Sequence, residues 1–362
     1  MTNQRIPSKQ ISIDGKKISK SSPAYFIAEI GSNFDQDLSR AKDLIYMAKE
    51  AGADAAKFQH YTAQSLVSDV GFKGLADNNS HQASWKKSVF DTYADASINQ
   101  DWTNILRDTC ADAGLAFFTS PYSFDLVDLV DDFVPAHKIG SGDITWTGII
   151  EHIARKGKPV LLATGASNMA DVQRAMNVIL DVNSDIILMQ CNTNYAATRD
   201  NFNYLNLNVV SKFQEMFPGV ITGLSDHTLG DVSVLGAVAL GVRVIEKHFT
   251  DSTQREGPDH AFSMTPTTWR EMVERTRDLQ AALGVSEKEV EPNEKETKVL
   301  QRRSICAARD LSKGTIITEA HLNMLRPCPD DAIQPFEVGQ LVGRVVLRDI
   351  KSGEHLKWED VN

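Results

Sequence analysis

Short apolar runs alternate regularly with amphipathic segments from Pro23 onward, and this alternation constrains the fold more than any other feature of the chain. Eight runs are predicted to be buried strands: Tyr25–Ile30, Ala55–Gln59, Leu115–Thr119, Ala136–Ile139, Pro159–Thr164, Ile186–Gln190, Ile221–Leu224 and Val242–Lys247. Helices are predicted between and after them: Ser39–Ala51, Asn99–Ala113, Phe124–Phe133, Trp146–Lys156, Asp171–Asn183, Asn206–Phe217, Asp231–Leu240 and Thr267–Leu283. Eight strand-helix units in about 260 residues are typical of an α/β protein with a closed (β/α)8 TIM barrel.

An open, doubly wound sheet would also alternate strands with helices. It should carry a glycine-rich phosphate-binding turn after its first strand, and the turn here reads AEIGSN instead of GxGxxG. The barrel is therefore favoured. Its main irregularity is the excursion Tyr61–Ala96, which carries Asn78-Asn79 and Trp85 and is long enough to be a lid or a substrate wall at the barrel mouth.

Four parts of the chain differ in composition and in hydrophobic pattern. Residues 1–22 hold a short alternating piece and an Asp14-Gly15 turn, which predict a capping hairpin. Residues 23–284 form the predicted barrel, and the highly charged residues 285–300 form a linker. Residues 301–362 consist of short alternating pieces between turns, which predict a small β-rich module near the lower size limit for independent folding.

Charge and composition exclude several classes of partner. A net charge of -10 argues against nucleic acid and against an anionic membrane surface as the main partner. Met1–Lys20 is polar and no apolar run is long enough to cross a bilayer, so neither a signal peptide nor a membrane span is expected. The 4 cysteines lack CxxC spacing, which favours reduced thiols and a cytoplasmic location.

A histidine follows each of the last two predicted strands, at His227 and His248. Because parallel strands bring their C-terminal ends to one edge, the two imidazoles should face one cleft together with the carboxylates of Asp226 and Glu246. Either histidine alone is explained as well by a hydrogen-bonded strand end. The pair favours a catalytic divalent metal ion with positions left open for water and substrate.

Polar residues also end the other predicted strands, and the C-terminal mouth is where barrel enzymes carry their chemistry. These residues are Glu29, Lys57, Gln59, Ser120, Lys138, Ser141, Thr164, Thr193, Asn194 and Tyr195, with Asp259 in a later turn. Two lysines and several hydroxyls beside a metal ion suit a phosphate or a carboxylate. An alternative makes Lys57 or Lys138 the Schiff-base nucleophile of a metal-free aldolase.

Several long motifs resemble the sialic acid synthase family. They are AEIGSNFDQDLSRAKDLI, EAGADAAKFQ, FFTSPYS, KIGSGDI, GKPVLLATG, GLSDHTLG, ALGVRVIEKHF and GPDHAFSM. The C-terminal module resembles the antifreeze-like (SAF) domain that follows the barrel in that family. The resemblance implies a cytoplasmic transferase that condenses phosphoenolpyruvate with an N-acyl hexosamine, such as N-acetylmannosamine or a diacetamido-trideoxyhexose, and so makes a nonulosonic acid.

The same resemblance implies roles for individual residues. His227 and His248 match the ligands of a divalent metal, usually Mn²⁺, with Mg²⁺ or Co²⁺ as alternatives. Groups that hold phosphoenolpyruvate are matched by Lys57, Ser120, Lys138 and Ser141, and groups around the aminosugar by Glu29, Tyr195 and Asp259. Thr193 and Asp226 complete the predicted substrate-binding set. Arg326 matches an arginine that reaches the neighbouring subunit's site and contacts the N-acyl group, which implies a domain-swapped homodimer.

Some positions depart from the family pattern. Ala163 stands where a serine is frequent, Thr193 where serine or asparagine is common, and Ala196 where a proline usually follows the tyrosine. Phe34 occupies a position often held by histidine, and Cys328 follows Arg326 in place of the usual glycine motif. The last two changes fall where the sugar is expected to bind. A different class of function, a non-catalytic carbohydrate-binding or ice-binding protein, is disfavoured by catalytic-type residues at all the strand ends.

Overall fold

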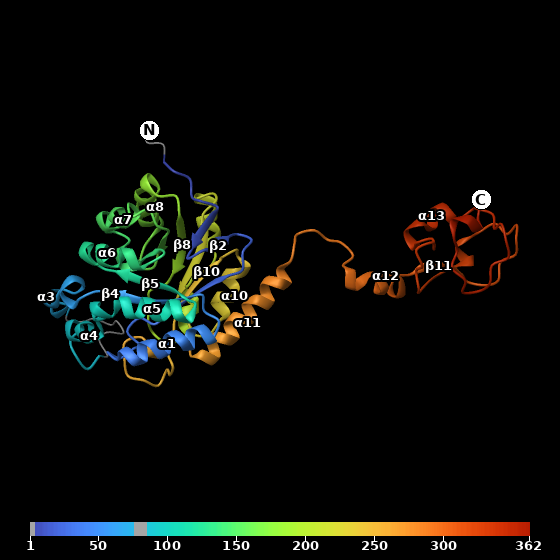
Figure 1. The fold of residues 1–362 in the computed structure, drawn as a ribbon. Helices are drawn as coiled ribbons and strands as arrows, with labels where there is room; N and C mark the ends of the chain where they lie inside the picture. Colours follow the sequence, from blue (N-terminus) through green and yellow to red (C-terminus); the bar gives the residue numbers. More distant parts are fainter. Residues whose placement is uncertain (1–3, 76–84) are drawn as a thin grey trace. The chain divides into compact units, whose positions relative to one another are not determined.

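The computed structural model describes residues 4–75 and 85–362. The chain divides into two compact units, which meet between Gly284 and Val285. Asn78-Asn79, singled out in the sequence, lies outside the described residues. Figure 1 follows the chain through both units.

Eight parallel strands form the sheet of the first unit (Figure 1). They are β3 (Tyr25–Glu29), β4 (Ala55–His60), β5 (Ala116–Pro121), β6 (His137–Ile139), β7 (Val160–Ala163), β8 (Ile186–Cys191), β9 (Ile221–Asp226) and β10 (Val244–His248). The hydrogen-bonded order is β5-β4-β3-β10-β9-β8-β7-β6, and β5 and β6 are also neighbours, so the ring is nearly closed. The predicted TIM barrel is confirmed.

Alternation along each strand sorts its side chains into two sets. Tyr25, Ile27 and Val244 point into one buried cluster inside the barrel, whereas Phe26 and Ile245 pack outward against the helices. Residues at the C-terminal strand ends that share the parity of the inner set therefore open onto the barrel mouth. This parity decides which polar strand-end residues belong to the site.

Helices cover the outside of the barrel (Figure 1). They are α1 (Leu38–Glu50), α5 (Thr103–Ala113), α6 (Phe124–Val130), α7 (Thr147–Ala154), α8 (Met169–Val182), α9 (Val209–Met216), α10 (Val232–Ala239) and α11 (Pro266–Leu283). Their ends follow local sequence signals: the Asp37 side chain caps α1, and Thr265 caps α11 just before Pro266. Two apolar clusters between helices and strands make up the outer core.

An N-terminal hairpin closes the other end of the barrel. Strands β1 (Gln10–Ile13) and β2 (Lys16–Ser19) pair antiparallel, and the turn places Asp14 and Gly15 at φ 48° and 75°. The buried isoleucines of the hairpin belong to the same cluster as the inner residues of the barrel strands. Because this end is filled by apolar side chains, the opposite mouth is left for ligands.

Three short helices follow β4 before the chain returns to the barrel wall. They are α2 (Ala63–Leu66), α3 (Asp69–Lys73) and α4 (Val89–Ala96). Helix α4 packs against both α2 and α3. Side-chain oxygens of Thr62, Ser68 and Ser88 cap the three helices in turn. The described residues of the excursion thus form a wall made of short capped helices.

The second unit begins with α12 (Lys295–Gln301) and has its own core. Strands β11 (Ser304–Ala307) and β12 (Leu322–Leu325) pair antiparallel, isolated bridges extend the pairing, and α13 (Val338–Leu341) follows. The core is a separate cluster that includes Ile305, Ile317, Ile333 and Leu356. In the part of the chain that the structure describes, no helix is both long and apolar enough to cross a membrane.

Candidate active site

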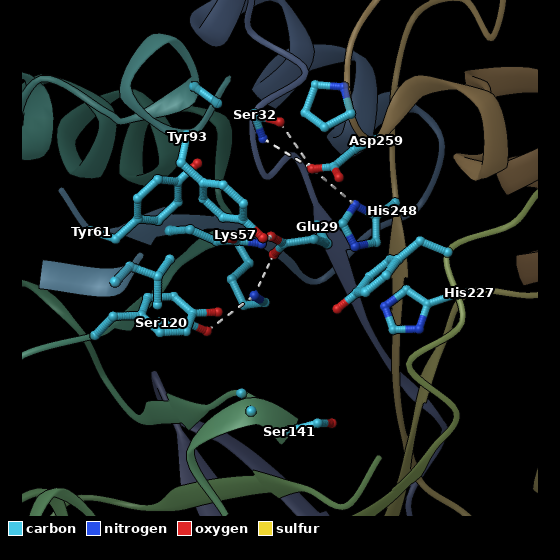
Figure 2. Close-up of a pocket in the computed structure, with 18 of the residues that line it drawn as sticks. Glu29, Ser32, Lys57, Tyr61, Tyr93, Ser120, Ser141, His227, His248 and Asp259 are labelled. Atoms are coloured by element: carbon cyan, nitrogen blue, oxygen red, sulfur yellow. Dashed lines mark hydrogen bonds and ion pairs between the residues drawn. The ribbon is translucent and has the colours of Figure 1, made fainter. Parts of the chain in front are cut away.

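A cavity opens at the C-terminal mouth of the barrel, and Figure 2 shows the residues that surround it. Most predicted site residues line it: Glu29, Lys57, Ser120, Lys138, Ser141, Tyr195, His227, His248 and Asp259. They come from seven of the eight strands or from the loops that follow them. The barrel therefore gathers into one space groups that are more than 200 residues apart in the sequence.

Two lysines and two glutamates form a buried charged cluster on the cavity floor. Lys57 Nζ lies 2.5 Å from Glu29 Oε2 and 3.4 Å from Glu246 Oε1, and Lys138 Nζ lies 3.3 Å from the same Glu246 oxygen. Burial raises the pKa of Glu29 to about 7, although Lys57 opposes the shift. Burial also favours the neutral amine of Lys57, but Glu246 and Glu29 outweigh it and raise the Lys57 pKa. The cluster thus carries two ammonium groups already desolvated for an anion.

Serine hydroxyls also line the cavity. Lys57 Nζ donates to Ser120 Oγ at 3.3 Å, and the backbone N–H of Gly165 donates to Ser141 Oγ at 2.9 Å. A Cβ atom at Gly165 would lie 2.9 Å from Ser141 Oγ and 2.5 Å from Thr193 Cγ2. Only glycine fits there, and it was missed because sequence reasoning looked for polar side chains alone.

His227 and His248 face one another at the edge of the cavity (Figure 2), with ring centroids 5.4 Å apart. His227 Nδ1 donates to the backbone oxygen of Asn192 at 2.8 Å, which leaves Nε2 as the nitrogen with a lone pair. His248 Nδ1 is buried without a hydrogen-bond partner among the described residues. Burial, with a further contribution from His227, holds the His248 pKa well below its ordinary value, so this ring is neutral.

Two facing imidazoles fit a divalent ion, which binds imidazole nitrogens through their lone pairs. Within residues 4–75 and 85–362 no third His, Cys, Asp or Glu joins them in a metal-binding arrangement. The remaining positions of an ion held here would fall to water or substrate, as in a catalytic rather than a structural site.

Asp259 reaches the cavity from the loop after β10. Its Oδ2 accepts a hydrogen bond from Ser32 Oγ at 3.0 Å and lies 3.6 Å from His248 Nδ1 (Figure 2). Burial raises the pKa of the Asp259 carboxyl group. Gly31, at φ 54°, makes this approach feasible, because a Cβ atom there would lie 2.7 Å from Asp259 Oδ2 and 3.2 Å from Glu29 Oε1.

The loop after β8 contributes one residue to the cavity and another to a depression beside it. Tyr195 lines the cavity, and its ring lies 4.5 Å from the His227 ring. Thr193 instead lines a neighbouring depression, which shares Cys191 with the main cavity. Thr193 is therefore displaced from the position expected of a substrate-binding residue.

Asp226 has a different position from the one expected of a substrate-binding residue. It is buried outside the barrel wall, where Oδ2 lies 2.6 Å from Lys247 Nζ and also accepts from the hydroxyls of Thr228 and Ser233. It does not line the cavity. The strand register pairs Asp226 with Lys247 and Ser225 with Glu246, so Ser225 and Glu246 take the inner positions.

Phe34 does not line the cavity: it is buried, with its ring 6.3 Å from Phe58 and 6.1 Å from Trp102, so it packs in the core instead of facing a sugar. Arg326 lies in the second unit, directly after β12. It is exposed, and its guanidinium has no hydrogen-bond or ion-pair partner among the described residues.

Aromatic residues of the excursion after β4 complete the cavity, and sequence reasoning assigned none of them individually. The rings of Tyr61 and Tyr93 lie 5.6 Å apart, those of Tyr61 and Tyr122 6.0 Å, and those of Trp85 and Tyr93 6.0 Å. A cluster of Tyr and Trp in a segment predicted to be a substrate wall was the available signal.

Fold and site define a TIM-barrel protein whose C-terminal mouth carries a cavity lined by two lysines and two histidines. Comparison with known proteins then gives the family. Residues 44–288 match the NeuB family and residues 302–362 match the SAF domain. The chain belongs to the NeuB family and ends in a SAF domain, and its relatives support an enzyme of the synthase type.

Named relatives include sialic acid and related synthases. N,N'-diacetyllegionaminic acid synthase from Legionella pneumophila is 33% identical, over 93% of this chain and 94% of its own. N-acetylneuraminate-9-phosphate synthase from Homo sapiens is 30% identical, over 96% and 95%. The crystal structure of N-acetylneuraminic acid (sialic acid) synthetase from Leptospira borgpetersenii, in complex with citrate, has a TM-score of 0.69 and 25% identity, covering 81% of this chain and 96% of its own.

Proposed function

We propose that this protein condenses phosphoenolpyruvate with an N-acyl hexosamine in a metal-dependent reaction that forms a nonulosonic acid and releases phosphate. The observation that supports this best is one cavity lined by Lys57, Lys138, two serine hydroxyls and two facing histidines. The names of the relatives, which are sialic, pseudaminic and legionaminic acid synthases, support the same class of product.

Phosphoenolpyruvate binds at the lysine end of the cavity. The ammonium groups of Lys57 and Lys138 pair with its phosphate and carboxylate, and Ser120 and Ser141 add hydroxyl donors. Such binding orients the enol carbon toward the aldehyde of the sugar, a proximity effect. The enol carbon bonds to the aldehyde carbon, water adds to the former C2 of phosphoenolpyruvate, and C–O cleavage releases phosphate.

His227 and His248 would hold the ion, Mn²⁺ by preference with Mg²⁺ or Co²⁺ as alternatives, and when bound it supplies Lewis-acid polarisation of the aldehyde oxygen. Glu29 exchanges protons near the reacting carbons. Because its pKa is about 7, both of its protonation states are populated near neutral pH, as a group that both accepts and donates a proton requires. Tyr195 and Asp259 contact the sugar from the loops above.

A coupled assay of phosphate release tests this function. Purified protein is incubated with phosphoenolpyruvate, Mn²⁺ and a panel of N-acyl hexosamines, and the nonulosonic acid is identified by mass spectrometry. Phosphate release that depends on the sugar, with product of the expected mass, supports the proposal. No release with any sugar in the panel, from protein that is folded and loaded with metal, contradicts it.

Two other functions make different predictions. A Schiff-base aldolase would need a lysine nitrogen free to attack the substrate, whereas Lys138 Nζ lies in an ion pair with Glu246, 3.3 Å from Oε1. Borohydride in the presence of sugar should therefore trap no adduct on Lys138. A non-catalytic carbohydrate-binding protein would bind sugar in a calorimeter without releasing phosphate from phosphoenolpyruvate.

Arg326 is proposed to complete the site of a second copy of the chain. Its guanidinium is exposed and has no partner among the described residues, which supports an intermolecular role, because such a donor can bind the oxygen of an N-acyl group. The protein would then be a domain-swapped homodimer with two shared sites.

A further inference from the structure

The two ends of the cavity differ sharply in chemistry. The floor carries the ammonium and carboxylate groups of the strand ends, whereas the excursion after β4 supplies mainly apolar and aromatic surface. The excursion residues in contact with the cavity include Leu66, Val67, Phe72, Trp85, Tyr93 and Ala96. We propose, on the basis of the function proposed above, that this surface selects an unphosphorylated aminosugar whose remote end carries apolar groups, namely a 6-deoxy sugar with an acylamino group at C4.

The position of the wall matches the remote end of such a sugar. The aldehyde carbon must lie near the histidines and the bound phosphoenolpyruvate, so the C4 to C6 end extends away from them. Figure 2 shows the rings of Tyr61 and Tyr93 on the side of the cavity opposite His227 and His248. Sugar C–H groups and methyl groups pack well on aromatic faces.

Ring contacts and helix packing hold the aromatic residues of this surface in place. Tyr61 is buried and contacts both Tyr93 and Tyr122, with interplanar angles of 66° and 80°. Trp85 packs on Tyr93, and α4, which carries Tyr93, packs on α2 and α3. A preformed apolar surface discriminates among ligands better than one that must be ordered on binding.

Charge argues against a phosphate at this end. The three lysines that the structure describes in the excursion all form exposed ion pairs: Lys73 with Asp69 at 2.6 Å, Lys86 with Glu256 at 3.0 Å, and Lys87 with Asp95 at 2.5 Å.

None of these three lysines lines the cavity, and residues 76–84 contain no lysine or arginine in their sequence. Among the described lining residues the only lysines are Lys57 and Lys138, at the strand ends, and there is no arginine. The cavity of one chain therefore offers lysines for one phosphorylated substrate and not for two, and the Arg326 proposed to come from a second copy is assigned to the N-acyl group.

Kinetics with three sugars tests the inference. At fixed phosphoenolpyruvate and Mn²⁺, phosphate release is measured with N-acetylmannosamine, N-acetylmannosamine 6-phosphate and 2,4-diacetamido-2,4,6-trideoxymannose. We expect kcat/KM to be highest for the trideoxy sugar, by roughly tenfold or more over N-acetylmannosamine, and lowest for the 6-phosphate. Equal or higher kcat/KM for either of the other two sugars would overturn the inference while leaving the proposed function intact. Absence of release with all three contradicts both.

Substitutions on α3 connect the preference to the wall. Phe72→Ala should lower kcat/KM for the trideoxy sugar more than for N-acetylmannosamine and so reduce the ratio several-fold. Phe72→Leu should restore most of it. Val70→Ala is the matched control, because Val70 lies on the same helix but is 82% exposed and does not line the cavity. An unchanged ratio in a folded Phe72→Ala protein would show that this wall does not set the preference.

Discussion

The Glu29 carboxylate and the Lys57 ammonium form a buried ion pair, with Oε2 and Nζ 2.5 Å apart, between register partners on the neighbouring strands β3 and β4. Removing one partner of such a pair costs more than removing both, because the remaining charge stays buried without compensation. We expect Lys57→Gln to destabilise the fold strongly and Glu29→Gln,Lys57→Gln to recover part of the loss. Urea unfolding of the four proteins of this cycle should give a coupling energy of about 1–3 kcal/mol.

The same cycle has a pH signature. Glu29 already has a raised pKa of about 7, and the loss of Lys57 removes an effect that lowers it. In Lys57→Gln, Glu29 is therefore protonated more readily, and the destabilisation should be smaller at pH 6 than at pH 8. Additive single effects at both pH values would mean that the two groups do not interact.

The buried pair of Asp226 and Lys247 predicts a structural role for Asp226. Asp226→Asn should lower the free energy of unfolding by roughly 3 kcal/mol, because Lys247 loses its counter-charge. The KM values for both substrates should stay unchanged, since Asp226 does not line the cavity. Lys138→Gln is the contrasting variant and should raise the KM for phosphoenolpyruvate. A raised substrate KM without loss of stability in Asp226→Asn would favour the original sequence-based assignment.

Asp226 and Lys247 show which part of the fold the sequence predicts and which part it does not. The eight strands were predictable because strands buried on both faces are continuous apolar runs bounded by helix caps and glycines. The inner or outer orientation of Asp226 was not predictable from position alone. The register supplies it: Asp226 pairs with Lys247 on the outer side, and Ser225 pairs with Glu246 on the inner side.

Some residues that shape the cavity were harder to predict from the sequence than the polar residues at strand ends. Gly31 and Gly165 matter because a Cβ atom would collide with site side chains, a property visible only in three dimensions. The aromatic wall was recognised as a segment but not residue by residue, since helices of four to eight residues have too few turns to show a clear period. Phe34 looked like a specificity residue, and the structure places it in the core.

The histidine pair predicts a metal requirement that can be measured without an activity assay. Wild-type protein stripped with chelator should gain thermal stability on addition of Mn²⁺, whereas His227→Ala and His248→Ala should not. Both variants should lose condensation activity by roughly 1000-fold or more while remaining folded. His152→Ala is the control, because His152 pairs with Asp128 outside the cavity. Full activity in excess chelator would rule out the metal.

His60 predicts part of the pH dependence of stability. It is buried between the hydroxyls of Thr119 and Thr103, at 2.7 Å and 2.8 Å, and burial lowers its pKa to about 4. Below pH 6.5 the unfolded chain binds a proton at this histidine and the folded chain does not until about pH 4. The contribution of neutral His60 to the free energy of unfolding is thus complete above pH 6.5. It falls by up to about 3 kcal/mol as the pH drops to 4.

Thermal or urea unfolding between pH 4 and 7 measures this effect. His60→Gln cannot titrate but keeps a donor and an acceptor for the threonines. The difference in unfolding free energy between wild type and His60→Gln should therefore shrink or change sign as the pH falls. A difference that is constant across the range would mean that His60 does not carry the proposed linkage.

Arg326 predicts complementation between two inactive variants. Arg326→Ala has an intact barrel, and His248→Ala has an intact C-terminal unit. If the arginine acts in the neighbouring subunit, a mixed dimer contains one site built from the wild-type barrel of the first variant and the wild-type C-terminal unit of the second. Co-expression in equal amounts should then restore about a quarter of wild-type activity, because half of the dimers are mixed and each has one complete site of two. If Arg326 instead acts in its own subunit, no site in the mixture is complete, and the co-expressed protein should be as inactive as either variant alone.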